Sequence, residues 1–363
     1  RLLDGRLTAD VTYYDKYTRD QIVESELSYL SNYQRVIINS GKISNKGWEI
    51  SVSGVPVKVK NFEWKTIFNW SKNNSMVESL PEGIDKIQIG SGVYNVKSYA
   101  EVGKPYGAIY AKTFKRDAEG YILCQLDGSP KEGQDYEYLG CVQADWRGGW
   151  NNVFRLGNFS FSVMFDFQKG GKFFSQTSIQ SSVDGQSVKS LEGRDADFFS
   201  RKILGESDEE RYGFMRPQNA NTPTANGQIY PDWGRPKGVV LPNCRYDEDV
   251  EGLAGQQVLG YCTPERYWMH YTSRDISRFI YDASYVKLRE ITVSYDLPKK
   301  WLRKTPFQTF RVAAVGRNIA TLFANTPHGL DPQATSTTGN AQGFERGFNL
   351  PSATYGFDIK VSF

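Results

Sequence analysis

The last eleven residues, 353–363, alternate strictly between apolar and polar side chains. Successive side chains of a β-strand point to opposite faces, so this segment would have one apolar, mostly aromatic face and one polar face. The apolar positions are Tyr355, Phe357, Ile359, Val361 and Phe363. Strands of outer-membrane β-barrels have this pattern, because one face meets lipid and the other lines a polar lumen. We therefore expect residues 353–363 to form a C-terminal barrel strand.

The same alternation recurs along the chain. Residues 159–167 place five apolar side chains on one face, with polar residues such as Ser160, Ser162 and Asp166 on the other. Further runs begin near Leu7, Trp48, Phe62, Trp150, Ile291 and Phe310. Together these make about eight strands, and 106–113 and 121–125 would raise the number to ten. Because about 9–11 tilted residues cross a bilayer, we predict an all-β chain of about 8–10 antiparallel spanning strands.

Composition excludes several other classes of protein. Although 14% of the residues are aromatic, no segment approaches the ~18 consecutive apolar residues of a membrane helix. A net charge of +3 gives no reason to expect nucleic-acid binding. His270 and His328 lie in no metalloprotease or triad motif, and there is no G-x-S-x-G elbow, so we expect no enzyme and no cofactor. A secreted β-rich glycan-binding protein or glycoside hydrolase is the alternative, since any two carboxylates can meet in space.

Connections between the runs alternate between short and long. The short ones are 54–61, 157–158 and 296–306, and Pro298 before K-K-W-L predicts one helical turn in the last. The long ones are 20–45, 77–105, 170–282 and 318–351. Short periplasmic turns and long external loops are typical of barrels, so 170–282 is predicted to be a long extracellular loop region. Aromatic residues near run ends, including Trp301, would lie at the membrane interfaces.

Two sets of residues in the predicted loops are candidates for special roles. Cys124, Cys141, Cys244 and Cys262 form two pairs close in sequence, so disulfides 124–141 and 244–262 are predicted, with free thiols as the alternative. Neither pair has the C-x-x-C spacing of structural zinc. The candidates for substrate or lid contact are Tyr230, Trp233, Tyr261, Tyr267 and Trp268. Packing between loops is the alternative role for these rings.

The strand count also implies that further strands exist. An open sheet of eight or ten strands has two unpaired edges, which lipid does not tolerate. The opening segment R-L-L-D-G-R-L has no signal-peptide layout. We therefore expect residues 1–363 to be the C-terminal portion of a larger barrel.

Several motifs resemble one transporter family. D-A-S-Y-V-K-L-R-E-I-T-V-S-Y-D-L-P at 282–298 resembles a block that enters a late strand in the SusC/RagA family of TonB-dependent outer-membrane transporters. N-K-G-W-E-I at 45–50, F-E-W at 62–64, N-W-S-K-N at 69–73, residues 311–318 and G-L-D-P at 329–332 follow in the family's order. The resemblance covers essentially the whole chain.

The resemblance implies a barrel of about 22 strands, whose plug domain and early strands lie outside these residues. It implies import of a large nutrient, a glycan or an oligopeptide, across the bacterial outer membrane. A SusD-like surface lipoprotein would cover the barrel and TonB would supply energy, while Ser160, Ser162, Asp166, Glu49 and Lys65 would line the lumen. The sequence departs from the family at 126–140, where the carboxylate spacing of a calcium loop is broken, so we predict no metal.

Overall fold

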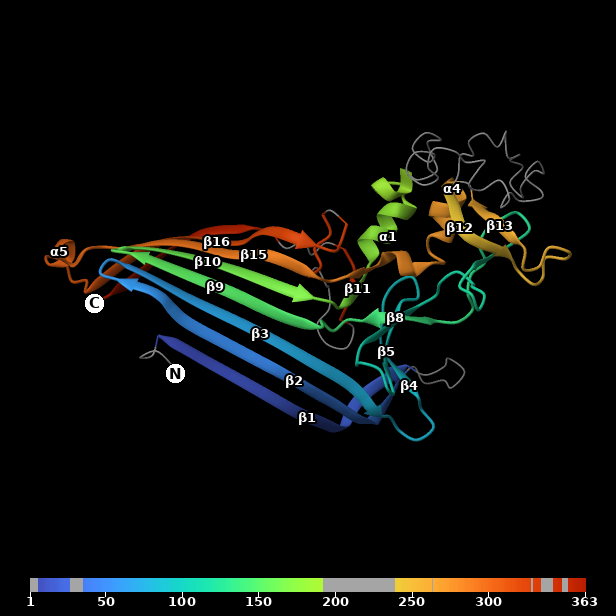
Figure 1. The fold of residues 1–363 in the computed structure, drawn as a ribbon, viewed down its shortest axis with the longest axis horizontal. Helices are drawn as coiled ribbons and strands as arrows, with labels where there is room; N and C mark the ends of the chain where they lie inside the picture. The colour runs from blue at the N-terminus through green and yellow to red at the C-terminus, as the bar shows by residue number, and fades with distance from the viewer. Residues whose placement is uncertain are drawn as a thin grey trace.

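A computed structural model describes residues 6–26, 35–191, 239–262, 264–327, 329–333, 342–347 and 352–363. For residues 20–26 and 35–40, and for positions 91, 240, 242, 259 and 261, it describes the backbone alone. One large antiparallel sheet dominates the described chain, and three small sheets lie at one end of it (Figure 1). No described helix has the length and apolar composition needed to cross a membrane.

The large sheet has eight strands that pair in sequence order, each antiparallel to the next (Figure 1). They are β1 (Leu7–Glu26), β2 (Arg35–Val59), β3 (Phe62–Ser79), β9 (Trp146–Leu156), β10 (Phe159–Lys169), β15 (Tyr285–Asp296), β16 (Thr309–Ala324) and β18 (Thr354–Ser362). These are the eight runs that alternation predicts. β1 and β18 are the two edges, so the described sheet is open, which is consistent with one segment of a barrel wall.

The two ends of the sheet differ in their connections. At the end that contains both chain termini, β2–β3 and β9–β10 are joined by two-residue turns, and α5 (Lys299–Leu302) forms the predicted helical turn after Pro298 (Figure 1). At the other end, the predicted loops 20–45 and 318–351 are shorter than expected. The reason is that β1, β2 and β16 extend beyond the alternating runs, to Glu26, Arg35 and Ala324.

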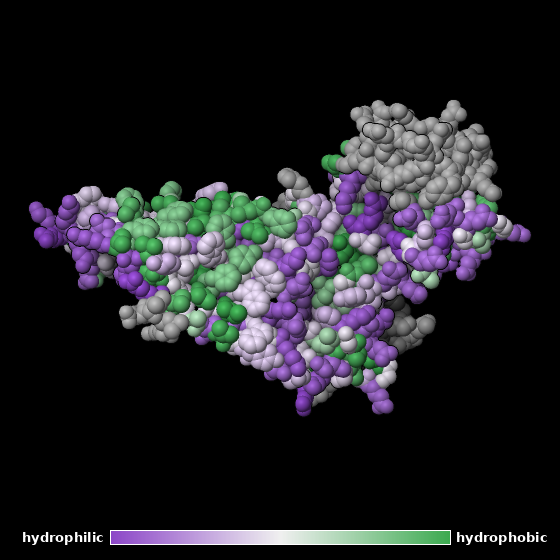
Figure 2. Space-filling view, viewed as in Figure 1, coloured by the Kyte–Doolittle hydropathy of each residue, from purple (hydrophilic) through white to green (hydrophobic). Residues whose placement is uncertain are grey.

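One face of the sheet carries the apolar side chains. Phe161 lies between Phe154 and Val293 in the neighbouring strands, and further pairs continue the row towards both edges. Phe159 is 57% exposed and Phe357 is 87% exposed. Figure 2 shows the resulting apolar surface over β10, β15 and β16, with hydrophilic residues beyond both ends. Strands of eleven residues such as β10 extend for about 36 Å, which at a tilt of about 45° matches an apolar band of about 25 Å.

Two polar residues interrupt this apolar face, and tryptophan side chains satisfy both. Thr66 and Asn152 lie directly opposite each other in β3 and β9. The indole Nε1 of Trp150 donates to Thr66 Oγ1 at 2.8 Å, and Nε1 of Trp64 donates to Asn152 Oδ1 at 3.1 Å. Lipid offers no hydrogen bonds, so a polar side chain there needs a partner in the protein. The tryptophans therefore contribute both apolar surface and the required donors.

The small sheets form the folded part of the long connections. They comprise β4 (Lys86–Ser91), β5 (Lys97–Glu101), β6 (Ala108–Ala111) and β8 (Glu137–Cys141); β7 (Ile122–Cys124), β12 (Val239–Tyr246) and β13 (Gln257–Cys262); and β11 (Lys172–Ser175), β14 (Ile280–Asp282) and β17 (Phe344–Glu345). Short helices lie beside them: α1 (Gln176–Val183), η2 (Val188–Leu191), α4 (Pro264–Arg266), η5 (Tyr267–Tyr271) and η6 (Ile276–Phe279). The suggestion that 106–113 and 121–125 add two spanning strands is wrong. They form β6 and β7, which are four and three residues long and pair only with other loop strands.

Candidate functional site

The second face of the large sheet is polar. Strand register places Asp10, Ser51, Asn69, Gly149 and Asp166 in one row across β1, β2, β3, β9 and β10. A cavity of about 410 Å³ lies along this row, and Thr12, Glu49, Ser71 and Arg147 are among its other lining residues.

The register also tests the predicted lumen residues. All five lie on this polar face: Glu49, Lys65, Ser160, Ser162 and Asp166. We call it the inner face.

A second cavity of about 430 Å³ adjoins the first at the loop end of the sheet. The two cavities share Arg147 and Asp166, and the second is also lined by Gln168, Tyr285 and Gln333. We call the two cavities together the inner-face site. Arg147 donates through Nε to Gln168 Oε1 at 2.9 Å and has no salt bridge to a described residue. Its positive charge therefore lies at a cavity that the carboxylates of Asp10, Glu49 and Asp166 also line, with none of these three at salt-bridge distance from it.

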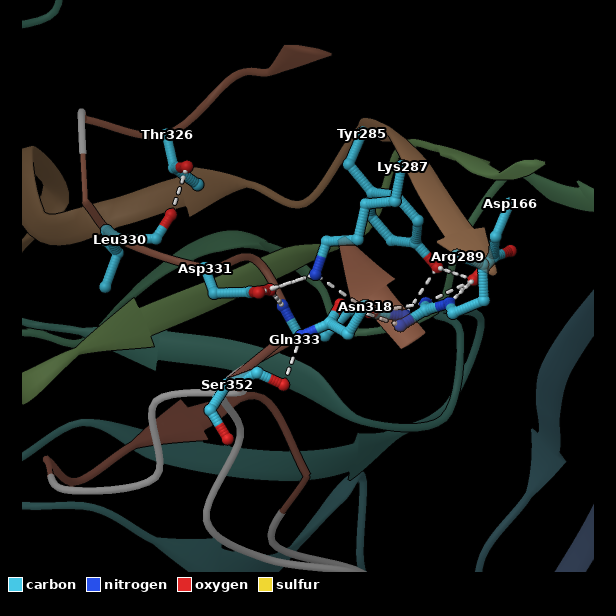
Figure 3. Close-up of polar contacts among 10 residues, drawn as sticks. All are labelled: Asp166, Tyr285, Lys287, Arg289, Asn318, Thr326, Leu330, Asp331, Gln333 and Ser352. Carbon is cyan, nitrogen blue, oxygen red and sulfur yellow. Dashed lines mark hydrogen bonds and ion pairs between the residues drawn. The ribbon is translucent and has the colours of Figure 1, made fainter. Parts of the chain in front are cut away.

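Asp166 is the centre of a polar network on the inner face (Figure 3). Its Oδ2 accepts from Arg289 Nε at 3.2 Å, from Arg289 Nη2, and from the Tyr285 hydroxyl at 3.3 Å. Gln333 joins the network from a segment far along the chain. Its Nε2 donates to the Tyr285 hydroxyl at 2.6 Å, and its Oε1 accepts from Arg289 at 2.7 Å.

Lys287 and Asp331 form the most buried ion pair of this network (Figure 3). Lys287 Nζ lies 2.6 Å from each carboxylate oxygen of Asp331, and 3.0 Å from Gln333 Oε1. The Lys287 side chain is only 1% exposed and that of Asp331 is 13% exposed. Two motifs noted in the sequence, the D-A-S-Y block and G-L-D-P, thus meet in space, and the pair holds residues 329–333 against the inner face.

A β-bulge at Arg289 makes this clustering possible. In β10, Leu288 and Glu290 pair with the successive residues Phe165 and Met164, and Arg289 has no partner. The register with β16 also shifts here, because Leu288 pairs with Ala320 and Glu290 with Arg317. The extra residue shifts the alternation, so Tyr285 and Lys287 face inward before the bulge, and Glu290 faces inward after it. Sequence analysis missed this feature, although two consecutive charged residues inside an alternating run indicate it.

The start of the D-A-S-Y block is fixed by its own polar side chains. Asp282 Oδ1 accepts from the Ser284 N–H at 2.9 Å and from Asn325 at 3.2 Å, and Lys172 lies 3.4 Å from its other oxygen. The Ser284 hydroxyl accepts from the Gly170 N–H at 2.8 Å. Burial alone would raise the pKa of Asp282, but these hydrogen bonds and Lys172 outweigh it and lower the pKa to about 2. The ends of β10, β15 and β16 are therefore joined at one point beside the inner-face site.

The predicted loop aromatics are only partly described. Tyr267 and Trp268 are 1% and 2% exposed in a core cluster of the loop region, with ring centroids 5.1 Å apart. Both rings pack within the loop region in this structure, and their contact with substrate or lid stays a prediction. Tyr230 and Trp233 lie outside the described residues, and the structure describes only the backbone of Tyr261. Substrate or lid contact by these three residues stays a prediction.

The cysteine pairing differs from the sequence expectation. None of the four cysteines forms a disulfide in this structure, so neither predicted disulfide is present. Cys124 and Cys244 lie in the adjacent strands β7 and β12, whereas Cys141 belongs to β8 in a different sheet. Cys262 is opposite Val239 rather than Cys244. A hydrogen bond with the Cys244 thiol, together with burial, raises the pKa of Cys124. Proximity in sequence was therefore a poor guide to proximity in the fold.

Asp247 anchors the loop region electrostatically. Its side chain is 4% exposed and lies 2.9 Å from Lys115 Nζ and 2.8 Å from Lys131 Nζ. Burial alone would raise the pKa of Asp247, but the two lysines outweigh it and lower the pKa to about 2. Asp247 is therefore a buried, paired carboxylate of the loop region.

Comparisons with known proteins agree with this architecture. TonB-dependent receptor P3 of Formosa agariphila is 24% identical in an alignment 376 positions long, which covers 98% of this chain and 31% of the receptor. TonB-dependent receptor P26 of the same organism is 26% identical over 193 residues, which cover 48% of this chain and 19% of that receptor. No protein-family model matches the chain.

Solved structures give the same fold. A structure of the RagAB peptide transporter superposes with a TM-score of 0.60 and 17% identity, over 99% of this chain and 33% of that chain. The RagAB peptide importer in its closed-closed state gives 0.61 and 17%, over 99% of this chain and 34% of that chain.

The chain is similar to a segment of SusC/RagA-like TonB-dependent receptors. It spans about a third of the length of these receptors. The eight strands of the large sheet thus match part of the barrel wall of the RagAB structures. Among the described residues, no group of three or more metal-ligating side chains is present. The inner-face site is equipped to bind polar solutes by hydrogen bonds and charge.

Proposed function

We propose that this receptor segment forms part of the wall of an outer-membrane transporter that imports a large nutrient, either a glycan or an oligopeptide. TonB would energise import, the plug and remaining strands would come from the rest of the receptor, and a SusD-like surface lipoprotein would cover the outer opening. The observation that carries this proposal is the division of one sheet into an apolar aromatic face and a polar face with two adjoining cavities.

The inner-face site suggests how a solute would be held on its way inward. Asp10, Glu49 and Asp166 provide acceptors, and Arg147 provides a charged donor whose contact among the described residues is Gln168. Such a mixed surface suits a long solute with many polar groups. An ionised carboxylate of the solute, such as a peptide C-terminus or a uronic acid, would form a charge-assisted hydrogen bond with Arg147.

Uptake by cells tests the proposal. The full-length receptor gene would be deleted and complemented with the wild type, with Arg147→Gln, or with Lys65→Gln as a matched inner-face control outside both cavities. We expect deletion to abolish uptake of one class of labelled solute, oligopeptide or glycan, and Arg147→Gln to reduce it several-fold. Lys65→Gln should have little effect.

Receptor location and abundance must be measured alongside uptake. The wild-type receptor should fractionate with the outer membrane and require detergent for extraction, and all variants should be present in equal amounts. A receptor that is soluble without detergent, or a deletion strain that imports both solute classes normally, would contradict the proposal.

A further inference from the structure

We propose that the segment 296–311, which joins β15 to β16 through α5, binds anionic phospholipid headgroups at the short-turn end of the barrel wall. This inference rests on the proposed outer-membrane location. It assigns a lipid-binding role to a part of the chain that is remote from the inner-face site (Figure 1).

The segment concentrates positive charge. Residues 296–311 contain five basic side chains and one acidic one, which is more net charge than the +3 of the whole chain. Lys299, Lys300, Arg303 and Lys304 are all exposed.

The one acidic residue of this segment is already paired. Asp296 is held by the guanidinium of Arg311 at 2.6 and 2.9 Å. No described residue forms a salt bridge with any of the four exposed cations around α5, so they remain available to an external anion.

Apolar contacts fix the segment where the apolar band ends. Leu302 is 6% exposed and anchors α5, whereas Trp301 beside it is 60% exposed. Phe307 packs against Phe310 and Phe363, with ring centroids 6.0 and 5.3 Å apart. In Figure 2, the hydrophilic tip at the α5 end directly borders the apolar surface of the sheet.

This arrangement matches the order of layers in a bilayer. Aromatic side chains favour the boundary between hydrocarbon and headgroups, and basic side chains just beyond it attract anionic lipid phosphates. An acidic protein partner would also suit the charge, but it would not account for the continuity with the lipid-facing band. We therefore assign the four cations to lipid phosphates in the adjacent leaflet.

The test uses the full-length receptor purified in detergent. Cardiolipin, phosphatidylglycerol, phosphatidylcholine or inorganic phosphate would be titrated in, and lipid binding would be followed by native mass spectrometry. The variant carries Lys299→Gln, Lys300→Gln, Arg303→Gln and Lys304→Gln. A second variant, with Lys→Arg at the three lysines and Arg→Lys at 303, keeps the charge. The matched control neutralises Lys16, Arg19, Lys72 and Arg116, four exposed basic residues far from α5.

We expect the wild type to bind cardiolipin and phosphatidylglycerol in preference to phosphatidylcholine, with no competition from inorganic phosphate. Each charge removed should weaken binding up to about fivefold, which corresponds to about 1 kcal/mol per basic residue at an anionic surface. Neutralising all four basic residues together should therefore weaken lipid binding at least tenfold. The charge-retaining variant and the matched control should bind like the wild type.

Equal binding by wild type and neutralised variant would overturn the inference, as would equal binding of zwitterionic and anionic lipid. Selective loss of a copurifying acidic protein, with lipid binding unchanged, would assign the surface to that partner instead. None of these outcomes contradicts the proposed function. A failure of the outer-membrane proposal would instead appear as a receptor that is extracted from cells without detergent.

Discussion

Replacement of Asp331 by Asn removes one charge from the buried ion pair with Lys287 while keeping the side-chain shape. At 2.6 Å, with an effective dielectric constant of about 20, the gross attraction in the pair is about 6 kcal/mol. Most of this offsets the cost of desolvating the ammonium group. Removing one partner of a buried pair typically costs about 3–5 kcal/mol, because the other charge stays buried. Gln333 still accepts a hydrogen bond from Lys287, so we expect the low end, about 3 kcal/mol.

This cost should appear as local opening rather than global unfolding. Residues 329–333 rest on the inner face through this pair, and the eight-stranded sheet does not depend on them. A change of about 3 kcal/mol corresponds to more than a hundredfold increase in the opened population. Hydrogen exchange of the 326–333 segment in the full-length receptor would measure it.

The matched variant is Lys287→Met, which removes the buried charge. It leaves the carboxylate of Asp331, whose side chain is 13% exposed and can therefore be hydrated. We expect it to cost about 1 kcal/mol, and the double variant Lys287→Met with Asp331→Asn to resemble it, because coupled partners are not additive. If Lys287→Met opened the segment as much as Asp331→Asn, or if Asp331→Asn changed nothing, the burial argument would be refuted.

Three further predictions concern other parts of the chain. Phe161→Arg should destabilise the receptor in lipid by about 2–4 kcal/mol in urea titrations, whereas Ser162→Arg on the inner face should cost far less; equal costs would mean that the faces are misassigned. Trp64→Phe removes the donor to Asn152 and should cost about 1–3 kcal/mol, most of which the additional change Asn152→Val should restore. The pKa of Asp247 falls from 3.8 in the unfolded chain to about 2 in the fold, so its stabilising effect is complete above about pH 4 and is lost as the pH falls through 2. Protection of the β12 amides from hydrogen exchange should decrease as the pH falls through 2. In the Asp247→Asn variant, the β12 amides should be equally weakly protected at neutral pH.

Much of the fold follows from local pattern. Alternation with a period of two identifies each spanning strand separately, because lipid on one side and polar lumen on the other act on every strand alike. It therefore predicts eight strands, the lumen-facing residues such as Asp166 and Lys65, and the two-residue turn at 157–158. The connection expected over 54–61 is only two residues long, because β2 continues to Val59. The same pattern has little power for the loop region, where 121–125 resembles a spanning strand but pairs with β12 instead.

The candidate site was less predictable. Asp166 is marked by alternation alone, but its partners Tyr285 and Arg289 come from a strand more than a hundred residues away. Gln333, which bonds to both of these partners, comes from a loop that lies farther still along the chain. The bulge at Arg289 reverses the phase of β15, so a strict alternation argument places the residues on one side of it incorrectly.

Outside the bulge at Arg289, local alternation is enough to assign each side chain to the lipid-facing or the water-facing side, since that choice is made residue by residue along each strand. Long-range packing, by contrast, brings Lys287 to Asp331, places Cys124 beside Cys244 rather than Cys141, and buries Trp268. These contacts depend on how segments that are distant in sequence pack together. The loops do not lie between lipid and water, so no repeating pattern of apolar and polar residues marks their contacts in the sequence.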